Sequence, residues 1–399
     1  MRFLTIRCLL PILALGLLKT PSLRAQDRFA DVPRQVQPFV DRSEISGAVM
    51  LLADRDKILH LSAVGTSDVA TGRKMRTDDI FWIASMTKPM TGVCIGMLVD
   101  EGKLAFDDPV EKYLPEFQGQ WVAQEASANH RVLVRAARPI TLRDLLTHTS
   151  GLGEYAVTDP HWTLSEYVKV LAREPLRFQP GTRWAYSTAG FDTLGRVVEA
   201  VSGMPFATFV QQRLLDPLGM TQTTFWPAAD LAPRFAHQYV RNDQAGRLEE
   251  TPIHYMYGGA VTDRGRPALG GAGLFSTAED VTKFYQMMLH DGVWHGRRLL
   301  QSATVAAMTH KQTGGIKARP GMPWGYGFCV IEDPSQMEAN NHLSPGTFGH
   351  GGAFGTQSWA DPTTGLVYVF MIQRDKMKLN PDNSPMRRAY QDAIAAGLR

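Results

Sequence analysis

The chain has 399 residues, of which 44% are hydrophobic and 20% are charged, a composition typical of a globular protein with a sizeable core. Its formal net charge of +3 becomes −1 without residues 1–25, because that segment carries four basic residues and no acidic ones. A mature chain this close to neutral gives no support for binding nucleic acid or an anionic membrane, so neither is expected as a partner.

The N-terminal segment, residues 1–25, has the pattern of a secretory signal peptide. Arg2 and Arg7 precede an apolar run over Cys8–Leu18, and a small residue, Ala25, follows soon after. This run is too short to span a bilayer comfortably. We therefore expect cleavage near Ala25, a periplasmic or secreted protein, and no stable membrane insertion after cleavage. A retained N-terminal anchor is the alternative.

A β-hairpin is the first folded element that the sequence predicts. Gly47–Ala53 and Lys57–Val64 are two apolar runs joined by a short polar turn. The chain then passes through an apolar segment into a predicted helix, which begins near Ser85 and continues to about Glu101. Gly102 is its expected C-cap, because glycine readily adopts the left-handed conformation that ends many helices.

The middle of the chain, from about residue 107 to 227, shows mostly helix and loop signals. Apolar residues recur there at helical spacing, and Gly and Pro separate the runs. The predicted helices of this region span Leu142–Leu146, Leu164–Ala172, Phe191–Val201 and Phe206–Leu215. A later amphipathic helix is predicted over Thr277–Leu289, with Ser276 as its cap and Glu279 completing a capping box.

Strand signals return near the C-terminus, before a closing helix over Met386–Leu398. The predicted strands are Gly327–Glu332, Gly349–Ala353, Thr356–Ala360 and Leu366–Gln373, the last two joined by a turn over Asp361–Gly365.

Strands at both ends of the chain predict an α+β fold, an α/β sandwich in which N- and C-terminal segments build one antiparallel sheet flanked by helices. Sequential βαβ alternation is absent, which argues against a doubly wound parallel sheet. We expect one folded domain over residues 26–399. Residues 27–106 and about 255–399 would form its α/β part, and about 107–254 an inserted, mostly helical domain. The junction of the two parts is the expected ligand site.

Only Cys94 and Cys329 remain after signal cleavage, and both lie in apolar runs. Both are interpreted as buried small hydrophobic residues, and whether they form a disulfide is left open. No cysteine or histidine cluster has metal-ligand spacing, so we predict neither a metal nor a cofactor.

The most informative motif is Ser85-Met86-Thr87-Lys88. A serine hydroxyl is a poor nucleophile until a nearby base takes its proton, and a desolvated lysine loses its charge more easily. Because residues three apart share a helix face, the S-x-x-K spacing supplies a nucleophile and its activator within one turn. Alone the motif is weak, since a helix-capping serine followed by a solvated lysine has the same letters.

Two later segments offer partners for Ser85. Tyr186 lies on a loop before a predicted helix, where a phenol beside cationic groups could serve as a proton shuttle; an ordinary tyrosine at a helix start is the plain alternative. His350 lies in a glycine-rich strand, which lets a backbone approach a substrate closely; a strand bulge with an exposed histidine is the alternative.

The order and spacing of Ser85–Lys88, Tyr186 and His350–Gly352 resemble those of the β-lactamase-like serine hydrolases, in particular class C β-lactamases, family VIII carboxylesterases and D-amino-peptidases. Further segments that are similar to this family are Thr141–Leu152, Pro180-Gly181, Gly270–Thr277 and Trp324–Gly327. The resemblance covers roughly residues 30–398 and implies a β-lactamase/transpeptidase-like fold.

The resemblance implies a role for each matched residue. Ser85 would be the acylated nucleophile and Lys88 its activating neighbour. Tyr186 would protonate the leaving group and later help to deprotonate the hydrolytic water. His350 would line the site where many relatives have lysine. The backbone N–H groups of Ser85 and Ala353 would form the oxyanion hole, with Gly351 and Gly352 beside the substrate.

Two departures from the family pattern bear on the substrate. Many β-lactamases carry Y-x-N at the second motif, whereas this chain has Thr188, which cannot present both an amide donor and an acceptor. His350 in place of lysine removes a fixed positive charge that would attract a substrate carboxylate. Both changes favour an ester, or another uncharged acyl donor, over a penicillin. His148, in the Thr141–Leu152 segment, is interpreted as structural.

The sequence therefore predicts a serine hydrolase that works through an acyl-enzyme, with a small-molecule ester or amide as its substrate. A carboxylesterase acting on small or short-chain esters is preferred. A β-lactamase or D-Ala-D-Ala-type peptidase, and a non-enzymatic protein that binds cell-wall peptides or an acylated ligand, remain as alternatives. G-x-S-x-G does not flank Ser85, which disfavours an α/β-hydrolase. The oligomeric state is left open.

Overall fold

The computed structural model describes residues 28–126, 130–155, 159–253, 260–337, 342–376 and 384–399. The predicted signal peptide lies outside these residues, so its cleavage stays a prediction. Within the described ranges, no helix combines the length and hydrophobicity that crossing a membrane requires.

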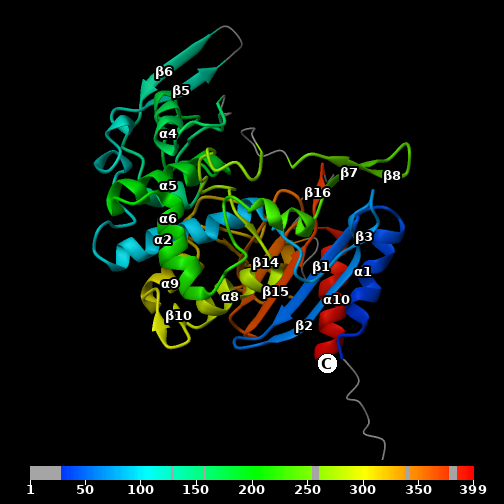
Figure 1. Ribbon diagram of the computed structural model, residues 1–399. Coiled ribbons are helices and arrows are strands. Elements are labelled where there is room, and N and C mark those ends of the chain that lie inside the picture. The colour runs from blue at the N-terminus through cyan, green and yellow to red at the C-terminus, as the bar shows by residue number, and fades with distance from the viewer. Residues whose placement is uncertain (1–27, 127–129, 156–158, 254–259, 338–341, 377–383) are drawn as a thin grey trace, which may run out of the picture.

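A seven-stranded sheet lies at the centre of the fold, and every neighbouring pair of its strands is antiparallel (Figure 1). In spatial order the strands are β12 (Cys329–Val330), β13 (Phe348–Gly351), β14 (Gln357–Asp361), β15 (Leu366–Met371), β1 (Gly47–Ala53), β2 (Ile58–Asp68) and β3 (Arg73–Lys74). Because β15 pairs directly with β1, the two ends of the chain build one sheet, as the sequence predicts.

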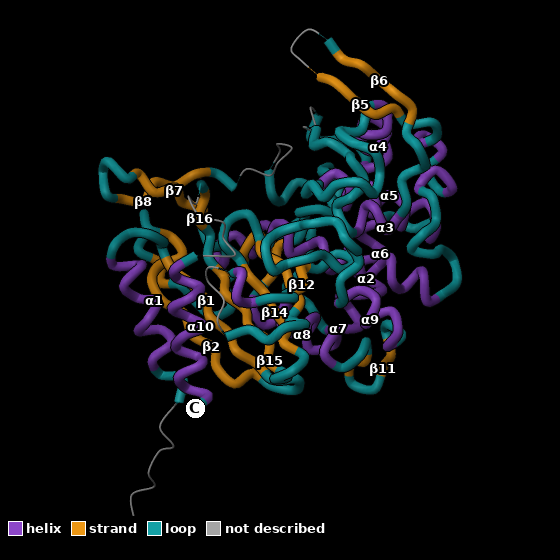
Figure 2. The backbone as a smooth tube through the Cα atoms, turned by 180° about the vertical axis from the view of Figure 1, so that it is seen from behind, coloured by secondary structure: helices purple, strands orange, loops and turns teal. Residues whose placement is uncertain are grey.

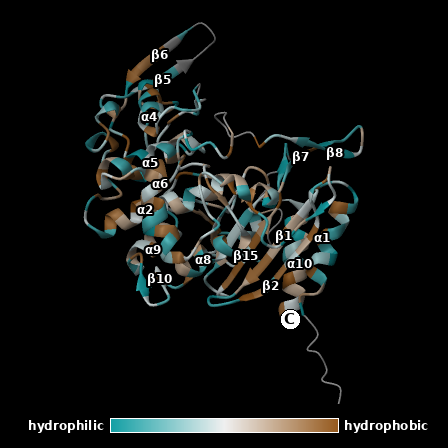
Figure 3. Cartoon of the chain, in the orientation of Figure 1, coloured by the Kyte–Doolittle hydropathy of each residue, from teal (hydrophilic) through white to brown (hydrophobic). Residues whose placement is uncertain are grey.

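Helices cover both faces of this sheet, so its middle strands are buried on both sides. In β1, Ala48, Met50 and Leu52 pack toward α1 and α10, while the residues between them join the core shared with α2 and α8. Figure 2 shows α1 and α10 side by side over one face of the sheet. Figure 3 shows hydrophobic residues concentrated along β1 and β15. The result is the predicted α/β sandwich.

Most helices lie close to where the spacing of apolar residues predicts them. The helices of the structure are α1 (Asp31–Asp41), α2 (Thr87–Asp100), α3 (Leu142–Leu146), α4 (Leu164–Arg173), α5 (Thr188–Ser202), α6 (Phe206–Val210), α7 (Asp216–Leu218), α8 (Ala278–Leu289), α9 (Ser302–Thr309) and α10 (Pro385–Leu398). Gly102 follows α2 with a φ of +67°, as expected of a residue that ends a helix.

One predicted helix cap is wrong. The cap of α8 is Thr277 rather than Ser276: the Thr277 side chain accepts a hydrogen bond from Asp280 N. Ser276 lies instead in a short strand, β9 (Phe275–Ser276), where its hydroxyl is buried and lies 2.7 Å from Thr223 Oγ1. Both residues are cap formers, and pairing of β9 with β4 (Phe81–Trp82) decides between them.

Several elements were not predicted. Among them are helices α1, α7 and α9, strand β3, the hairpin of β5 (Trp121–Ala126) and β6 (Arg131–Arg135), the short hairpin of β10 (Val293–Trp294) and β11 (Arg297–Arg298), and the ribbon of β7 (Gln238–Asn242) and β8 (Arg247–Thr251). The β7–β8 ribbon joins β16 (Arg374–Asp375), which runs parallel to β7 just after the central sheet. Part of the 107–254 segment is therefore β-structured and pairs with the C-terminal part of the chain.

Cys94 in α2 and Cys329 in β12 are both buried, and neither forms a disulfide. Their separation into different core clusters agrees with their interpretation as small hydrophobic residues.

Candidate active site

Ser85 and Lys88 lie side by side at the start of a buried helix. Ser85 is the middle residue of a short 3₁₀ turn, η1 (Ala84–Met86), which continues directly into α2. Lys88 Nζ donates a hydrogen bond to Ser85 Oγ at 3.1 Å. The local backbone alone produces this contact, because residues three apart share a face of a helical turn.

The turn that carries Ser85 has an unusual backbone. Ala84 has a φ of +44°, which residues other than glycine rarely adopt. Thr87 holds this turn, since its Oγ1 donates to Ala84 O at 2.7 Å and accepts from Leu274 N at 3.1 Å. Ile83 N also donates to Leu274 O at 3.1 Å. Leu274, in the segment before β9, thus holds the turn that carries Ser85. A strained backbone of this kind persists only when surrounding contacts fix its conformation.

Lys88 is completely buried, at 0% exposure. Its Nζ donates a second hydrogen bond to Gly271 O at 2.7 Å and lies 3.5 Å from Thr188 Oγ1. Burial lowers the pKa of Lys88 to about 8, although the carboxylates of Asp192 and Glu154 act in the opposite direction. A lysine with this pKa has an accessible neutral form at moderate pH, which is the form able to take a proton from Ser85.

Asp192 supports Lys88 through the backbone of Gly271. The buried Asp192 Oδ1 accepts from Gly271 N at 2.8 Å, and Gly271 O accepts from Lys88. A Cβ at position 271 would lie 2.4 Å from Thr188 Cγ2, so only glycine allows this close approach. Sequence reasoning missed Asp192. The available signal was one acidic residue next to Phe191 in an apolar helix.

Tyr186 lies beside Lys88 at the start of α5. It directly precedes Ser187, the N-cap of α5, whose hydroxyl accepts from Gly190 N at 3.1 Å. Lys88 Nζ is 4.7 Å from the centre of the Tyr186 ring. The fold therefore brings the second predicted motif into contact with the first, across about a hundred residues of sequence.

His148 forms the support under the Tyr186 ring. The two rings are stacked, with centroids 4.4 Å apart and planes 29° from parallel. His148 Nδ1 accepts from Ser187 N at 3.0 Å, which places the hydrogen of the neutral ring on Nε2. Burial, with smaller effects from Lys88 and His350, holds the pKa of His148 well below its usual value, so the ring is neutral. His148 is therefore structural, as the sequence predicts, and its specific role is to position Tyr186.

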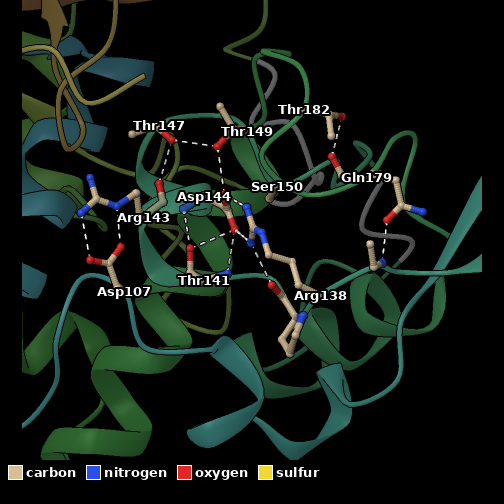
Figure 4. Close-up of polar contacts among 12 residues, drawn as sticks. Asp107, Arg138, Thr141, Arg143, Asp144, Thr147, Thr149, Ser150, Gln179 and Thr182 are labelled. Carbon is tan, nitrogen blue, oxygen red and sulfur yellow. Dashed lines mark hydrogen bonds and ion pairs between the residues drawn. The ribbon is translucent and has the colours of Figure 1, made fainter. Parts of the chain in front are cut away.

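A polar network around Asp144 fixes the loop that carries His148 (Figure 4). Asp144 accepts from Thr141 N at 2.9 Å, Arg138 Nη2 at 2.9 Å and Thr149 Oγ1 at 3.2 Å. The Thr141 and Asp144 side chains also form a capping box at the start of α3. These hydrogen bonds restrict the conformational freedom of the 147–150 loop. This restriction is the physical reason why the polar segment lies next to the active site.

His350 and the turn after it lie on the far side of Tyr186. The His350 and Tyr186 ring centroids are 6.1 Å apart, and His350 Nδ1 donates to Gly351 O at 2.7 Å. In the neutral ring, Nε2 is then the acceptor nitrogen. A Cβ on Gly352 would lie 2.7 Å from Ile83 O, so glycine lets this turn approach the segment before Ser85. Ala353 follows it and is exposed.

The structure thus brings Ser85, Lys88, Tyr186, Thr188 and His350 into one cluster, with the 351–353 turn packed against the approach to Ser85. Among the residues that the structure describes, no group of three or more His, Cys, Asp or Glu side chains could hold a metal ion. The chemistry available to these residues is nucleophilic attack by a serine with a lysine base and a tyrosine acid.

A second cation near Tyr186 was missed by sequence reasoning. The Arg319 guanidinium carbon is 5.9 Å from the Tyr186 ring centroid, 5.5 Å from that of Trp324 and 6.0 Å from that of Trp184. His148 packs against both tryptophans, at 5.1 and 5.9 Å between ring centroids. We call Tyr186, His148, Trp184, Trp324 and Arg319 the aromatic wall, and Ser85, Lys88, Gly271 and Asp192 the nucleophile wall.

Comparison with known proteins gives consistent results over most of the chain. A sequence model of the family described as Beta-lactamase matches residues 32–392. Esterase EstB of Burkholderia gladioli is 31% identical, over 88% of this chain and 91% of its own. Lovastatin esterase of Penicillium rubens is 33% identical, over 75% and 78%. The solved structure of EstCE1, a hydrolase with promiscuous acyltransferase activity, is 25% identical with a TM-score of 0.77, covering 92% of this chain and 98% of that one.

Proposed function

Since the chain belongs to the β-lactamase family and is a serine hydrolase, we propose that it is a carboxylesterase acting on small or short-chain esters through an acyl-enzyme. The observation that carries the proposal is the contact of Ser85 Oγ with the buried Lys88 Nζ at 3.1 Å, beside Tyr186. The pair supplies both a nucleophile and a base whose pKa is lowered by burial.

In the acylation step, Ser85 Oγ attacks the ester carbonyl carbon while its proton passes to the neutral Lys88 Nζ. The carbonyl oxygen becomes an oxyanion, for which the backbone N–H groups of Ser85 and Ala353 are the proposed donors. When the intermediate collapses, the bond to the alkoxy oxygen breaks. Tyr186 gives its proton to that oxygen, and the alcohol leaves. Tyr186 regains a proton from Lys88, with which its ring is in contact.

Deacylation uses the same residues in reverse. A water molecule attacks the acyl carbon while Tyr186 takes a proton from it and passes its own proton to the neutral Lys88 Nζ. The bond between the acyl carbon and Ser85 Oγ then breaks, Lys88 returns its proton to Ser85 Oγ, and the carboxylic acid is released. Each group thereby returns to its starting state.

Two features support an ester over a β-lactam. Thr188 Oγ1 is 3.5 Å from Lys88 Nζ, so the third residue of the tyrosine motif presents a hydroxyl where an asparagine would present an amide. His350 occupies the strand position of a fixed lysine charge and donates its Nδ1 hydrogen to Gly351 O. The names of EstB and lovastatin esterase, both more than 30% identical, point in the same direction.

The test compares turnover of 4-nitrophenyl butyrate with that of a chromogenic cephalosporin, using purified wild-type protein and Ser85→Ala. We expect kcat/KM for the ester to exceed that for the cephalosporin, and the variant to lose both activities. Faster cephalosporin hydrolysis would favour the alternative, a β-lactamase or D-Ala-D-Ala-type peptidase. Residual ester turnover equal to wild type in the variant would contradict the assignment of Ser85.

Export is a separate proposal, supported by the charge and hydropathy pattern of residues 1–25. N-terminal sequencing of protein expressed with its leader should begin near Gln26. An intact leader on membrane-bound protein would favour the retained anchor.

A further inference from the structure

Glu154 lies in the loop between α3 and α4, outside the three motifs that carry the proposed catalytic residues. Its side chain reaches the start of α5, where one carboxylate oxygen accepts a hydrogen bond from Thr188 N and the other accepts from Ala189 N at 3.3 Å. Thr188 is also the residue whose Oγ1 lies 3.5 Å from Lys88 Nζ. The Glu154 carboxylate is therefore separated from the proposed base by a single residue.

Backbone contacts on both sides of Glu154 fix the loop that carries it. Leu152 O accepts from Arg177 Nη2 at 3.1 Å, and Tyr155 O accepts from the hydroxyl of Tyr167 at 3.1 Å. Tyr167 is itself buried in α4. These anchors and the hydrogen bonds to α5 give the Glu154 carboxylate a defined place, so it lacks the conformational freedom of an ordinary surface glutamate.

The carboxylate occupies a position that would otherwise attract an anion. The first N–H groups of a helix have no partner inside the helix and lie at the positive end of its dipole. Glu154 accepts from the first two of α5, and the N-cap Ser187 accepts from Gly190 N at 3.1 Å. A substrate carboxylate could therefore bind at the start of α5 only by displacing Glu154.

The negative charge of Glu154 also reaches the reacting groups. Burial lowers the pKa of Lys88, and the carboxylates of Asp192 and Glu154 act against this effect. Asp192 is buried, whereas Glu154 is exposed. Of these two carboxylates, Glu154 is thus the one that a substrate arriving from solvent meets, beside Thr188 and Lys88.

We propose that Glu154 selects substrates by charge: it disfavours esters with a carboxylate near the reacting bond, so that the natural substrates are uncharged or cationic esters. This inference rests on the proposed esterase function and specifies its substrate class. Repulsion between two carboxylates weakens binding of an anionic ester and leaves a neutral one unaffected. His350, in place of a lysine, supplies no permanent positive charge that would offset this repulsion.

The experiment uses three matched pairs of esters. The mono-4-nitrophenyl ester of adipic acid and 4-nitrophenyl hexanoate differ by a negative charge on the acyl group. The esters 4-acetoxybenzoate and methyl 4-acetoxybenzoate differ by a negative charge on the leaving group. Butyrylcholine and 3,3-dimethylbutyl butyrate differ by a positive charge on the alcohol.

Steady-state kcat and KM are measured for wild type, Glu154→Gln and Glu154→Asp. Glu154→Gln keeps an oxygen that can accept from α5 and removes the charge, whereas Glu154→Asp keeps the charge. Glu279→Gln, which removes an exposed acidic charge from the first turn of α8, is the matched control. Measuring at pH 9, where Lys88 with its pKa of about 8 is mostly neutral, separates substrate selection from the effect of Glu154 on that pKa.

We expect Glu154→Gln to raise kcat/KM for the anionic esters by about 3- to 10-fold, mainly through KM, and to lower it for butyrylcholine by a similar factor. The neutral esters should change by less than about twofold. The selective effects should shrink as ionic strength rises from about 0.01 to about 1 M, because salt screens exposed charges. Glu154→Asp should keep the wild-type preference, and Glu279→Gln should change all six esters little.

A gain confined to one of the two anionic pairs would support the proposal and show on which side of the ester bond Glu154 acts. Three outcomes would overturn it. Equal losses of kcat for charged and neutral esters in Glu154→Gln would show that Glu154 only holds the start of α5. Selective effects that do not respond to salt would exclude a charge effect, and the absence of any selective effect would show that the carboxylate does not face the substrate. If wild-type protein hydrolysed none of the neutral esters, the proposed function itself would fail, which is distinguishable from the other results.

Discussion

The two walls of the site are built in different ways. In the nucleophile wall, hydrogen bonds link Ser85 to Lys88, Lys88 to Gly271 and Gly271 to Asp192, and every contact is 2.7 to 3.1 Å long. In the aromatic wall, ring centroids lie 4.4 to 6.4 Å apart in stacked, tilted and edge-to-face pairs, and three nitrogens lack a hydrogen-bond acceptor among the described residues. Hydrogen bonds fix direction, whereas stacked rings fix shape and leave polar capacity for a ligand.

This difference suggests that the two walls have different roles in the proposed reaction. The nucleophile wall sets the reactivity of Ser85 through the charge state of one lysine. The aromatic wall holds Tyr186, the proposed proton donor, through the stacked ring of His148. Changes in the first wall should therefore affect all substrates alike, while changes in the second should affect substrates differently.

The largest effect is expected from Lys88→Met, which removes the base and keeps the length and apolar part of the side chain. We expect kcat/KM for every ester to fall by about 10³-fold or more, within the range for losing a general base. Lys57→Met, at an exposed lysine in the β1–β2 turn, should leave activity unchanged. A Lys88→Met enzyme within tenfold of wild type would show that Ser85 is activated by another group.

The next largest effect is expected from Tyr186→Phe. The ring remains stacked on His148, so the fold and thermal stability should be kept, while kcat falls by about 10²-fold through loss of the proton donor. A poorer leaving group should suffer more than 4-nitrophenolate, which departs without protonation. Tyr113→Phe, remote from the site, is the control. Equal effects on good and poor leaving groups would contradict the role of Tyr186 as acid.

The pH profile tests the state of Lys88. Its pKa of about 8 means that the neutral base is the minor form at pH 7 and the major form at pH 9. We expect kcat/KM for a neutral ester to rise about tenfold between these values and then level off, following the fraction of neutral lysine. A profile that is flat or falls over this range would show that deprotonation of Lys88 does not limit acylation.

The smallest effect is expected from Asp192→Asn, which keeps an oxygen for Gly271 N and removes a charge that raises the pKa of Lys88. The rising limb of the pH profile should move to lower pH, with a change of only a few-fold at the plateau. Asp192→Ala, which also removes the hydrogen bond, should lower the plateau as well. An unmoved limb in Asp192→Asn would exclude electrostatic coupling between the two side chains.

The sequence predicts the sheet and most helices because their signals are local. The continuous apolar run of β1 and the helical spacing of α4 and α5 are readable from neighbouring residues. The β7–β8 ribbon was not predicted, since its strands are polar and partly exposed, without the apolar alternation that identifies a half-buried strand. The β5–β6 hairpin was missed although β6 contains a short apolar run over residues 132–134.

The difference between local signals and tertiary contacts also decides which residues of the candidate site could be predicted. Ser85, Lys88, Tyr186 and His350 could be named because each lies in a motif whose order is informative. Asp192 and Arg319 could not, because their importance comes from tertiary distances: one touches Gly271, and the other approaches Tyr186 from a loop more than a hundred residues away. Gly271 illustrates why tertiary contacts cannot be predicted from the sequence, since only the folded structure reveals that a Cβ at this position would contact Thr188.

The most direct test of the nucleophile assignment is intact-protein mass spectrometry after treatment with a fluorophosphonate probe, followed by peptide mapping. Wild-type protein should gain the mass of one adduct, located on Ser85, and folded Ser85→Ala should gain none. Labelling should slow as pH falls below about 8, because protonated Lys88 cannot activate the serine. Unlabelled wild-type protein, or an adduct elsewhere with Ser85 unmodified, would contradict the assignment of Ser85 as the nucleophile.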